Sequence, residues 1–204
     1  MRSTMLRTSW LVLGCLVATA GCRSTMLVAL PSNDAEWLSD FAAKATEPEH
    51  EVSIEAHLHA WQGEPRDLEG RATPVLVRIE NHGSTPVQIV KASFELMSGT
   101  SSFRTLAPER IVDRPAPLAA EELRDAVLGP GESRSGFLYF PRMTGYRGFV
   151  HLRAALLDTS RALLGSIDIP FGSGHVERCS LAYVDEREPR APTNMLFHTC
   201  LPPY

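Results

Sequence analysis

Residues Leu128–Leu157 read LGPGESRSGFLYFPRMTGYRGFVHLRAALL, and this stretch decides the fold. Pro130-Gly131 favours a tight turn, because proline presets φ and glycine accepts a positive φ. The apolar run Phe137–Phe140 is too short for a helix and ends at a proline, which is typical of a strand covered on both faces. After a glycine-bearing loop, apolar and polar residues alternate from Val150 to Leu156, as in a half-buried strand. We predict that these two strands pair antiparallel as the central hairpin of a β-sandwich.

The same two-residue period appears elsewhere in the chain, between turn signals rich in glycine, proline and asparagine. It predicts further strands at about 52–58, 75–79, 87–97, 103–106 and 163–169. In the third of these the alternation changes phase between Ile89 and Val90, as a β-bulge or a change of sheet requires. About seven short strands predict an all-β chain with an Ig-like, two-sheet antiparallel β-sandwich.

Two short helices are expected beside the strands. Ser32 or Asn33 can cap a helix before Pro48, because its apolar residues recur at helical spacing. Those residues are Leu38, Phe41, Ala42 and Ala45. This helix is expected to pack on the sandwich rather than lie on a membrane, since acidic residues outnumber Lys44. A second helical turn or two is expected within 119–127, as an insertion at one end of the sandwich.

The first residues have the features of a secretory signal peptide. Arg2 and Arg7 precede the uncharged segment 10–20, and small residues follow it. The segment is shorter than the roughly 20 apolar residues that span a bilayer. We therefore predict a signal peptide at 1–21, a lipid-anchored tether with the short helix at 22–49, the sandwich at 50–172 and a C-terminal tail at 173–204.

Thr19-Ala20-Gly21-Cys22 resembles the lipobox of bacterial lipoproteins, in which the cysteine is acylated and becomes the first residue. The resemblance implies attachment to a membrane through lipidated Cys22. Thr19 departs from the aliphatic residue usual there, and ordinary secretion with cleavage before Gly21 is the alternative. Arg23 after the cysteine implies, by the same resemblance, sorting to the outer membrane of a bacterial cell envelope. The domain would face the periplasm or be exposed at the cell surface.

The net charge and the number of cysteines limit which partners and which cellular compartment are expected. Loss of the signal peptide removes two arginines and no acid, which takes the formal net charge from -4 to -6. Nucleic acid is thus not expected as a partner, since binding it needs a basic surface. Three cysteines remain, and if lipid occupies Cys22, then Cys179 and Cys200 are left to form a disulfide in an oxidising space. The alternative is a frayed tail with two free thiols.

A family resemblance adds to this interpretation. The segment VLVRIENHGSTPV (75–87), Phe94-Glu95-Leu96 and Leu128-Gly129-Pro130-Gly131-Glu132 before Gly136-Phe137-Leu138 resemble bacterial extracytoplasmic Ig-like domains of the telokin type. They are similar, more distantly, to the β-sandwich proteinase inhibitors of bacilli. The resemblance covers roughly residues 50–172 and implies adhesion, binding or structural roles. The buried Cys…Trp…Cys arrangement of antibody domains is absent from the sequence.

The sequence offers few candidates for chemistry. Glu55, His57 and His59 alternate on one strand face and could converge on zinc or copper, although a solvated strand face is the preferred interpretation. Ser133 and Ser135 lack the spacing of a nucleophile elbow. We therefore expect no enzyme and no cofactor, but a lipid-anchored cell-envelope protein that acts as a binding or structural module. Another envelope protein is the candidate partner. The alternatives are a periplasmic metal-binding protein that uses His57 and His59, and then an undetected hydrolase.

Overall fold

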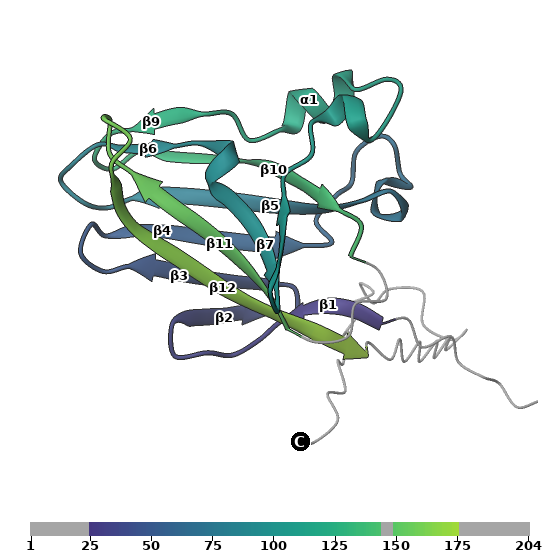
Figure 1. Cartoon of the computed structure of the whole chain (residues 1–204), viewed down its shortest axis with the longest axis horizontal. Helices are drawn as coiled ribbons and strands as arrows, with labels where there is room; N and C mark the ends of the chain where they lie inside the picture. Colours follow the sequence, from purple (N-terminus) through teal and green to yellow (C-terminus); the bar gives the residue numbers. More distant parts are fainter. Residues whose placement is uncertain (1–24, 144–148, 176–204) are drawn as a thin grey trace, which may run out of the picture.

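Apolar residues at every second position fold this chain into two antiparallel β-sheets (Figure 1). The computed structural model describes residues 25–143 and 149–175. One sheet has seven strands: β1 (Thr25–Ala29), β12 (Leu163–His175), β11 (Phe149–Leu157), β6 (Val87–Ile89) and β9 (Ala126–Leu128), with β7 (Phe94–Ser98) paired to β11 and β8 (Ser101–Arg104) to β7. The other has five: β10 (Ser133–Pro141), β5 (Ala72–Asn81), β4 (Val52–Leu58), β3 (Ala42–Glu47) and β2 (Ala35–Ser39).

The main core lies between the inner faces of these sheets. Val52, Ile54 and Ala56 of β4 are fully buried, as are Val75, Val77 and Ile79 of β5. Leu152 of β11 and Ile169 of β12 meet them from the opposite sheet. The predicted all-β sandwich and the inward phase of the β4 and β5 strands are therefore confirmed, although the described residues form twelve strands rather than about seven.

The predicted central hairpin is wrong. β10 pairs antiparallel with β5, whereas β11 pairs with β12, β7 and β6, so the two strands belong to different sheets. The chain leaves one sheet after Pro141 and enters the other at Phe149. β10 pairs instead with β5, which lies far earlier in the chain, and local alternation does not reveal such a partner.

β10 is covered on both faces, as the run Phe137–Phe140 predicts. Leu138 and Phe140 point into the main core, and Phe137 and Tyr139 point outward into a second, smaller core. The 3₁₀ turn Leu68–Gly70 and the short helix α1 (Ala116–Glu121) cover that outer face with Leu68 and Leu118. Helix α1 confirms a helical insertion in this part of the chain, although it begins three residues earlier than the expected segment and ends before Val127.

The change of phase after Ile89 marks a real interruption. β6 ends at Ile89, a 3₁₀ turn follows at Lys91–Ser93, and β7 begins at Phe94. Both short strands pair with β11, one near its end at Leu157 and one along its centre. The interruption therefore resets the side-chain phase within one sheet and does not transfer the chain to the other.

The predicted N-terminal helix is also wrong, because residues 35–47 form the hairpin of β2 and β3. The Ser32 hydroxyl accepts hydrogen bonds from the main-chain N–H groups of Asp34 and Ala35, so it stabilises a turn rather than a helix. Ala43 and Ala45 are buried, while Trp37 and Leu38 are exposed. The ladder between β3 and β4 outweighs the helical spacing, since tertiary pairing supplies more free energy than local propensity.

The sandwich extends beyond the expected 50–172 at both ends. Instead of a tether, residues Thr25–Ala29 form β1, which pairs with β12 from Phe171 to His175. The strand expected at 163–169 continues through Pro170 to His175 as β12, and Leu163 at its start is 68% exposed. The signal peptide, Cys22, Cys179 and Cys200 lie outside the described residues. In the described part, no helix combines the length and apolarity needed to cross a bilayer.

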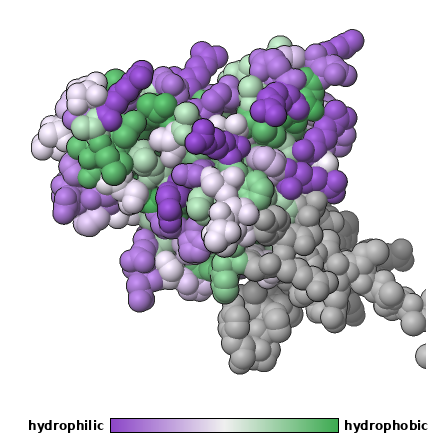
Figure 2. Space-filling model, in the orientation of Figure 1, coloured by the Kyte–Doolittle hydropathy of each residue, from purple (hydrophilic) through white to green (hydrophobic). Residues whose placement is uncertain are grey.

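Most of the outer surface in this view is hydrophilic, but apolar side chains gather at its upper left (Figure 2). Figure 1 places β9, β6 and the turn between β11 and β12 there. Val127, Gln88, Leu157 and Leu163 pair in one row across these four strands. Val127 and Leu163 are among the most exposed hydrophobic residues described, so one end of the seven-stranded sheet presents an apolar strip to solvent.

Candidate functional site

The candidate metal ligands of β4 are not brought together. His57 Nε2 lies 2.5 Å from Glu55 Oε1 on the outer face of the strand. His59 follows the end of β4, and its left-handed backbone, with φ at 55°, breaks the alternation of the strand. Its Nδ1 lies 3.0 Å from Glu69 Oε2, and its ring packs edge-on against Phe41. The three side chains therefore do not form a shared metal site.

Ser53, His82 and Glu80 lie close together on the outer face of the five-stranded sheet, but their geometry is not that of a hydrolase triad. Ser53 Oγ and Glu80 Oε2 lie 3.5 and 3.2 Å from the same atom, His82 Nε2. A triad needs the acid on one ring nitrogen and the nucleophile on the other, so that the ring can carry a proton. Ser53 is also 1% exposed. This grouping does not activate a nucleophile.

Glu47, Glu49 and His50, at the turn between β3 and β4, have ligand atoms that all lie within 4.8 Å of one another. A carboxylate–imidazole set of this kind suits a divalent cation. The buried Glu47 carboxylate already accepts hydrogen bonds from the N–H of His50 at 2.7 Å and of Glu49 at 3.3 Å, and Nδ1 of His50 lies 2.9 Å away. These bonds account for the arrangement as a brace for the turn.

The brace predicts an acid-dependent loss of stability. Burial alone would raise the pKa of Glu47, but hydrogen bonds from the His50 main chain and ring and from the Glu49 N–H lower it below its ordinary 4.5. A lowered carboxyl pKa stabilises the fold above the ordinary value, and this contribution is lost as pH falls through the folded-state pKa. We expect Glu47→Gln to be less stable than wild type at pH 7, with the two urea denaturation curves converging below about pH 4. Curves that stay equally far apart at every pH would contradict this role.

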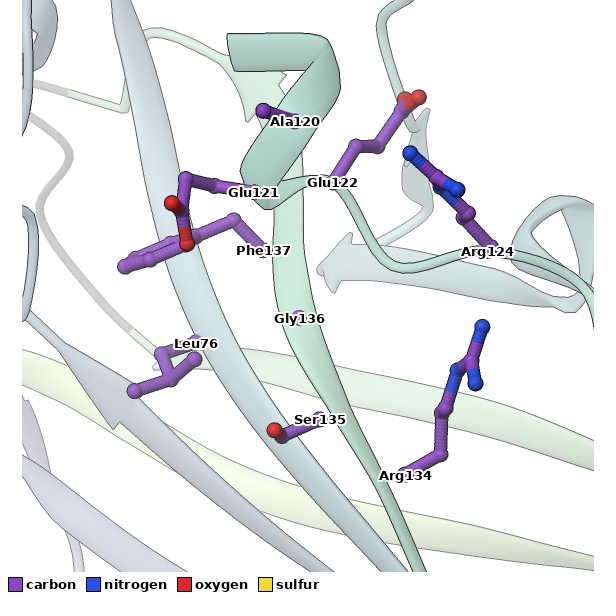
Figure 3. Close-up of a pocket in the computed structure, with 9 residues that line it drawn as sticks. All are labelled: Leu76, Ala120, Glu121, Glu122, Arg124, Arg134, Ser135, Gly136 and Phe137. Carbon is purple, nitrogen blue, oxygen red and sulfur yellow. The ribbon is translucent and has the colours of Figure 1, made fainter. Parts of the chain in front are cut away.

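A surface pocket of about 330 Å³ lies where α1 and the segment after it cross the edge of β10 (Figure 3). Its floor includes the buried Phe137 and the half-buried Leu76. Figure 3 shows Ser135 and Glu121 on the same side of β10 as these apolar residues. Two arginines, Arg124 and Arg134, line the other side. The pocket thus spans the edge of the sheet, with the two arginines and the Glu122 carboxylate on one side and an apolar floor on the other.

Gly136 permits the close contact that forms this pocket. A Cβ atom at Gly136 would lie 2.6 Å from the main-chain N and Cα of Leu123. The Leu123 N–H donates to the Phe137 carbonyl at 2.9 Å, and Glu122 bridges to Phe137 in parallel. Because β10 has no side chain at Gly136, the segment that carries Arg124 can pack directly on the strand that carries Arg134.

The base of the pocket is rigid. The hydroxyl of the buried Tyr139 donates to the Leu118 carbonyl at 3.0 Å and so joins β10 to α1. Burial raises the pKa of Tyr139, and the nearby carboxylates of Glu122 and Glu121 raise it further. Trp61 packs edge-on against Phe137 with ring centroids 5.0 Å apart. Tyr139 therefore remains neutral near pH 7 and acts as a structural donor.

No local sequence pattern predicts this pocket. Arg124 belongs to a segment without strand periodicity, and Arg134 precedes the apolar run Phe137–Phe140 that predicts its strand. Gly136, inside an apolar strand, was the available signal, because an isolated glycine in a strand often marks the close approach of another backbone.

These features place the chain among antiparallel β-sandwich proteins. No protein-family model and no curated protein matches the sequence. Among solved structures, it is similar to the crystal structure of a candidate lipoprotein, ycdA, from Bacillus subtilis, with 18% identity and a TM-score of 0.36. The match covers 68% of this chain and 39% of that protein, so this chain spans about two fifths of its length. At this identity and TM-score the similarity assigns no function.

Proposed function

We propose that this protein is a lipid-anchored component of a bacterial cell envelope that acts as a binding or structural module. The observation that carries the proposal is the position of β1. The first strand starts at Thr25, only three residues after Cys22, the cysteine that directly follows the signal-like segment. A folded body that begins so close to the candidate acylation site is suited to stay at a membrane surface.

The chemistry of the described side chains favours binding over catalysis. The serine and histidine candidates on the outer face of the five-stranded sheet lack the relay geometry, and His57 and His59 have separate carboxylate partners. The pocket at β10 instead offers two arginine side chains beside an apolar floor. Binding sites of this kind use a few placed polar groups beside an apolar surface. Outer-membrane sorting, suggested by Arg23, is part of the proposal.

Replacing Cys22 tests the anchor. We expect Cys22→Ala to move the protein from the membrane fraction to the soluble fraction, because the acyl chains of a lipoprotein supply the membrane affinity. Cys179→Ala is the matched control and should leave the protein in the membrane fraction. Mass spectrometry of the wild-type N-terminus should show an acylated peptide that begins at Cys22. An unmodified N-terminus at Gly21 would contradict the anchor while leaving the binding role open.

A further inference from the structure

We propose that the pocket at the edge of β10 binds a small ligand through an oxyanion head, a carboxylate or a phosphate, held by Arg124, Arg134 and the main-chain N–H of Ser135. The proposal gives a ligand class to the binding role proposed above. It rests on that role but not on the lipid anchor, since the residues concerned all belong to the folded body.

The pocket carries positive charge that no ion pair within the described residues neutralises. Arg124 and Arg134 line one pocket, and neither forms an ion pair with any described residue. The Glu122 carboxylate also lines the pocket, but it pairs with Lys91, whose Nζ lies 2.5 Å from Glu122 Oε1. Both arginine side chains are exposed, and an anion seated between the two guanidinium groups would offset their mutual repulsion. Guanidinium groups bind carboxylate and phosphate oxygens with paired hydrogen bonds.

The edge of β10 that faces away from β5 is only partly occupied by hydrogen bonds. This strand ends the five-stranded sheet, and the Leu123 and Leu106 N–H groups donate to the Phe137 and Tyr139 carbonyls from outside the sheet. Backbone groups alternate in direction along an antiparallel strand. The backbone groups of Ser135 therefore point to the same edge as those of Phe137 and Tyr139, away from β5. No hydrogen bond from another described residue reaches them there. The Ser135 N–H is an available donor between the two sides of the pocket.

The rest of the pocket limits what the head can be attached to. Leu76 and Phe137 offer an apolar floor, and the Glu121 carboxylate, which has no ion-pair partner among the described residues, lies on that side. A second negative charge on the ligand would meet Glu121. The pocket therefore suits a ligand with one anionic end whose other end is neutral or carries an amine.

The test uses the full-length protein in detergent with three probes: N-acetylglycylglycine, which has a free carboxylate, its amide, and inorganic phosphate. We expect the carboxylate probe or phosphate to saturate the protein and to shift the Ser135 amide resonance, whereas the amide probe should not bind. Arg124→Gln and Arg134→Gln should each weaken binding roughly 10- to 100-fold. Glu121→Gln should strengthen it, since a like charge is removed.

Arg104→Gln is the matched control, because Arg104 is an exposed arginine on β8 outside the pocket and should leave affinity unchanged. Unchanged thermal melting of all four variants shows that the fold is intact. Binding of the carboxylate probe alone assigns the site to carboxylate ligands, and binding of phosphate assigns it to oxyanions in general. No saturable shift with any probe, equal binding of the amide, or equal weakening by Arg104→Gln would overturn the proposal without bearing on Cys22.

Discussion

Replacing Leu152 by alanine is expected to lower the free energy of unfolding by about 2–5 kcal/mol. Leu152 lies at the centre of β11, is 1% exposed, and pairs with Leu96 on one neighbouring strand and Ile169 on the other. Its side chain points into the main core between the sheets, so truncation removes buried apolar contacts and leaves a cavity there. Urea denaturation of the two proteins measures the difference.

Arg153→Ala is the control for this measurement. Arg153 is the next residue on β11, and its side chain points outward, where it donates to Asp168 at 3.2 Å. A surface ion pair of this kind contributes about 0–1 kcal/mol. If Leu152→Ala unfolds like wild type while Arg153→Ala is strongly destabilised, the assigned register of β11 is wrong.

Gly83→Ala is expected to destabilise the protein by about 3 kcal/mol, the upper end for overpacking a tight site. A Cβ atom at Gly83 would lie 2.1 Å from the main-chain oxygen of His50. The two turns that meet here cannot separate easily, because the His82 N–H donates to the Glu51 carbonyl at 3.0 Å and the Gly83 N–H to Asn81 Oδ1 at 3.1 Å. Asn81 is itself fully buried.

Gly70→Ala provides the comparison for Gly83. No atom lies within 4 Å of the position where its Cβ would be, so we expect a change within about 1 kcal/mol. Thermal melts of the two variants beside wild type suffice. Equal melting temperatures for Gly83→Ala and Gly70→Ala would show that the turn between β3 and β4 does not press on Gly83 as described.

The sequence predicted strands best where burial follows a simple alternation. Val52, Ile54, Val77 and Ile79 point inward as expected, since each lies on a central strand with one face toward the core. The break after Ile89 was also visible, because a phase change is a local property. These features depend on side-chain period alone, which the sequence displays directly.

The remaining features depend on partners that lie far away along the chain. The β2–β3 hairpin was predicted as a helix because Leu38, Phe41, Ala42 and Ala45 fit a helical period, while pairing with β4 decides the outcome. The pocket at β10 needs residues 122–124 to cross Gly136, a contact that no local pattern encodes. Cys22, Cys179 and Cys200 stay predictions, since they lie outside the described residues.

The start of β1 at Thr25 limits the distance between the membrane and the folded body of an anchored molecule. Three residues span at most about 11 Å, so with Cys22 acylated the start of β1 is confined to a thin layer above the lipid. β12 pairs with β1 at its C-terminal end and has 13 residues, so its other end lies about 40 Å along the strand. With so short a tether, the folded body cannot reach partners far from the membrane. A partner has to come to the membrane surface to meet it, and diffusion in the plane of the bilayer then governs how often they meet.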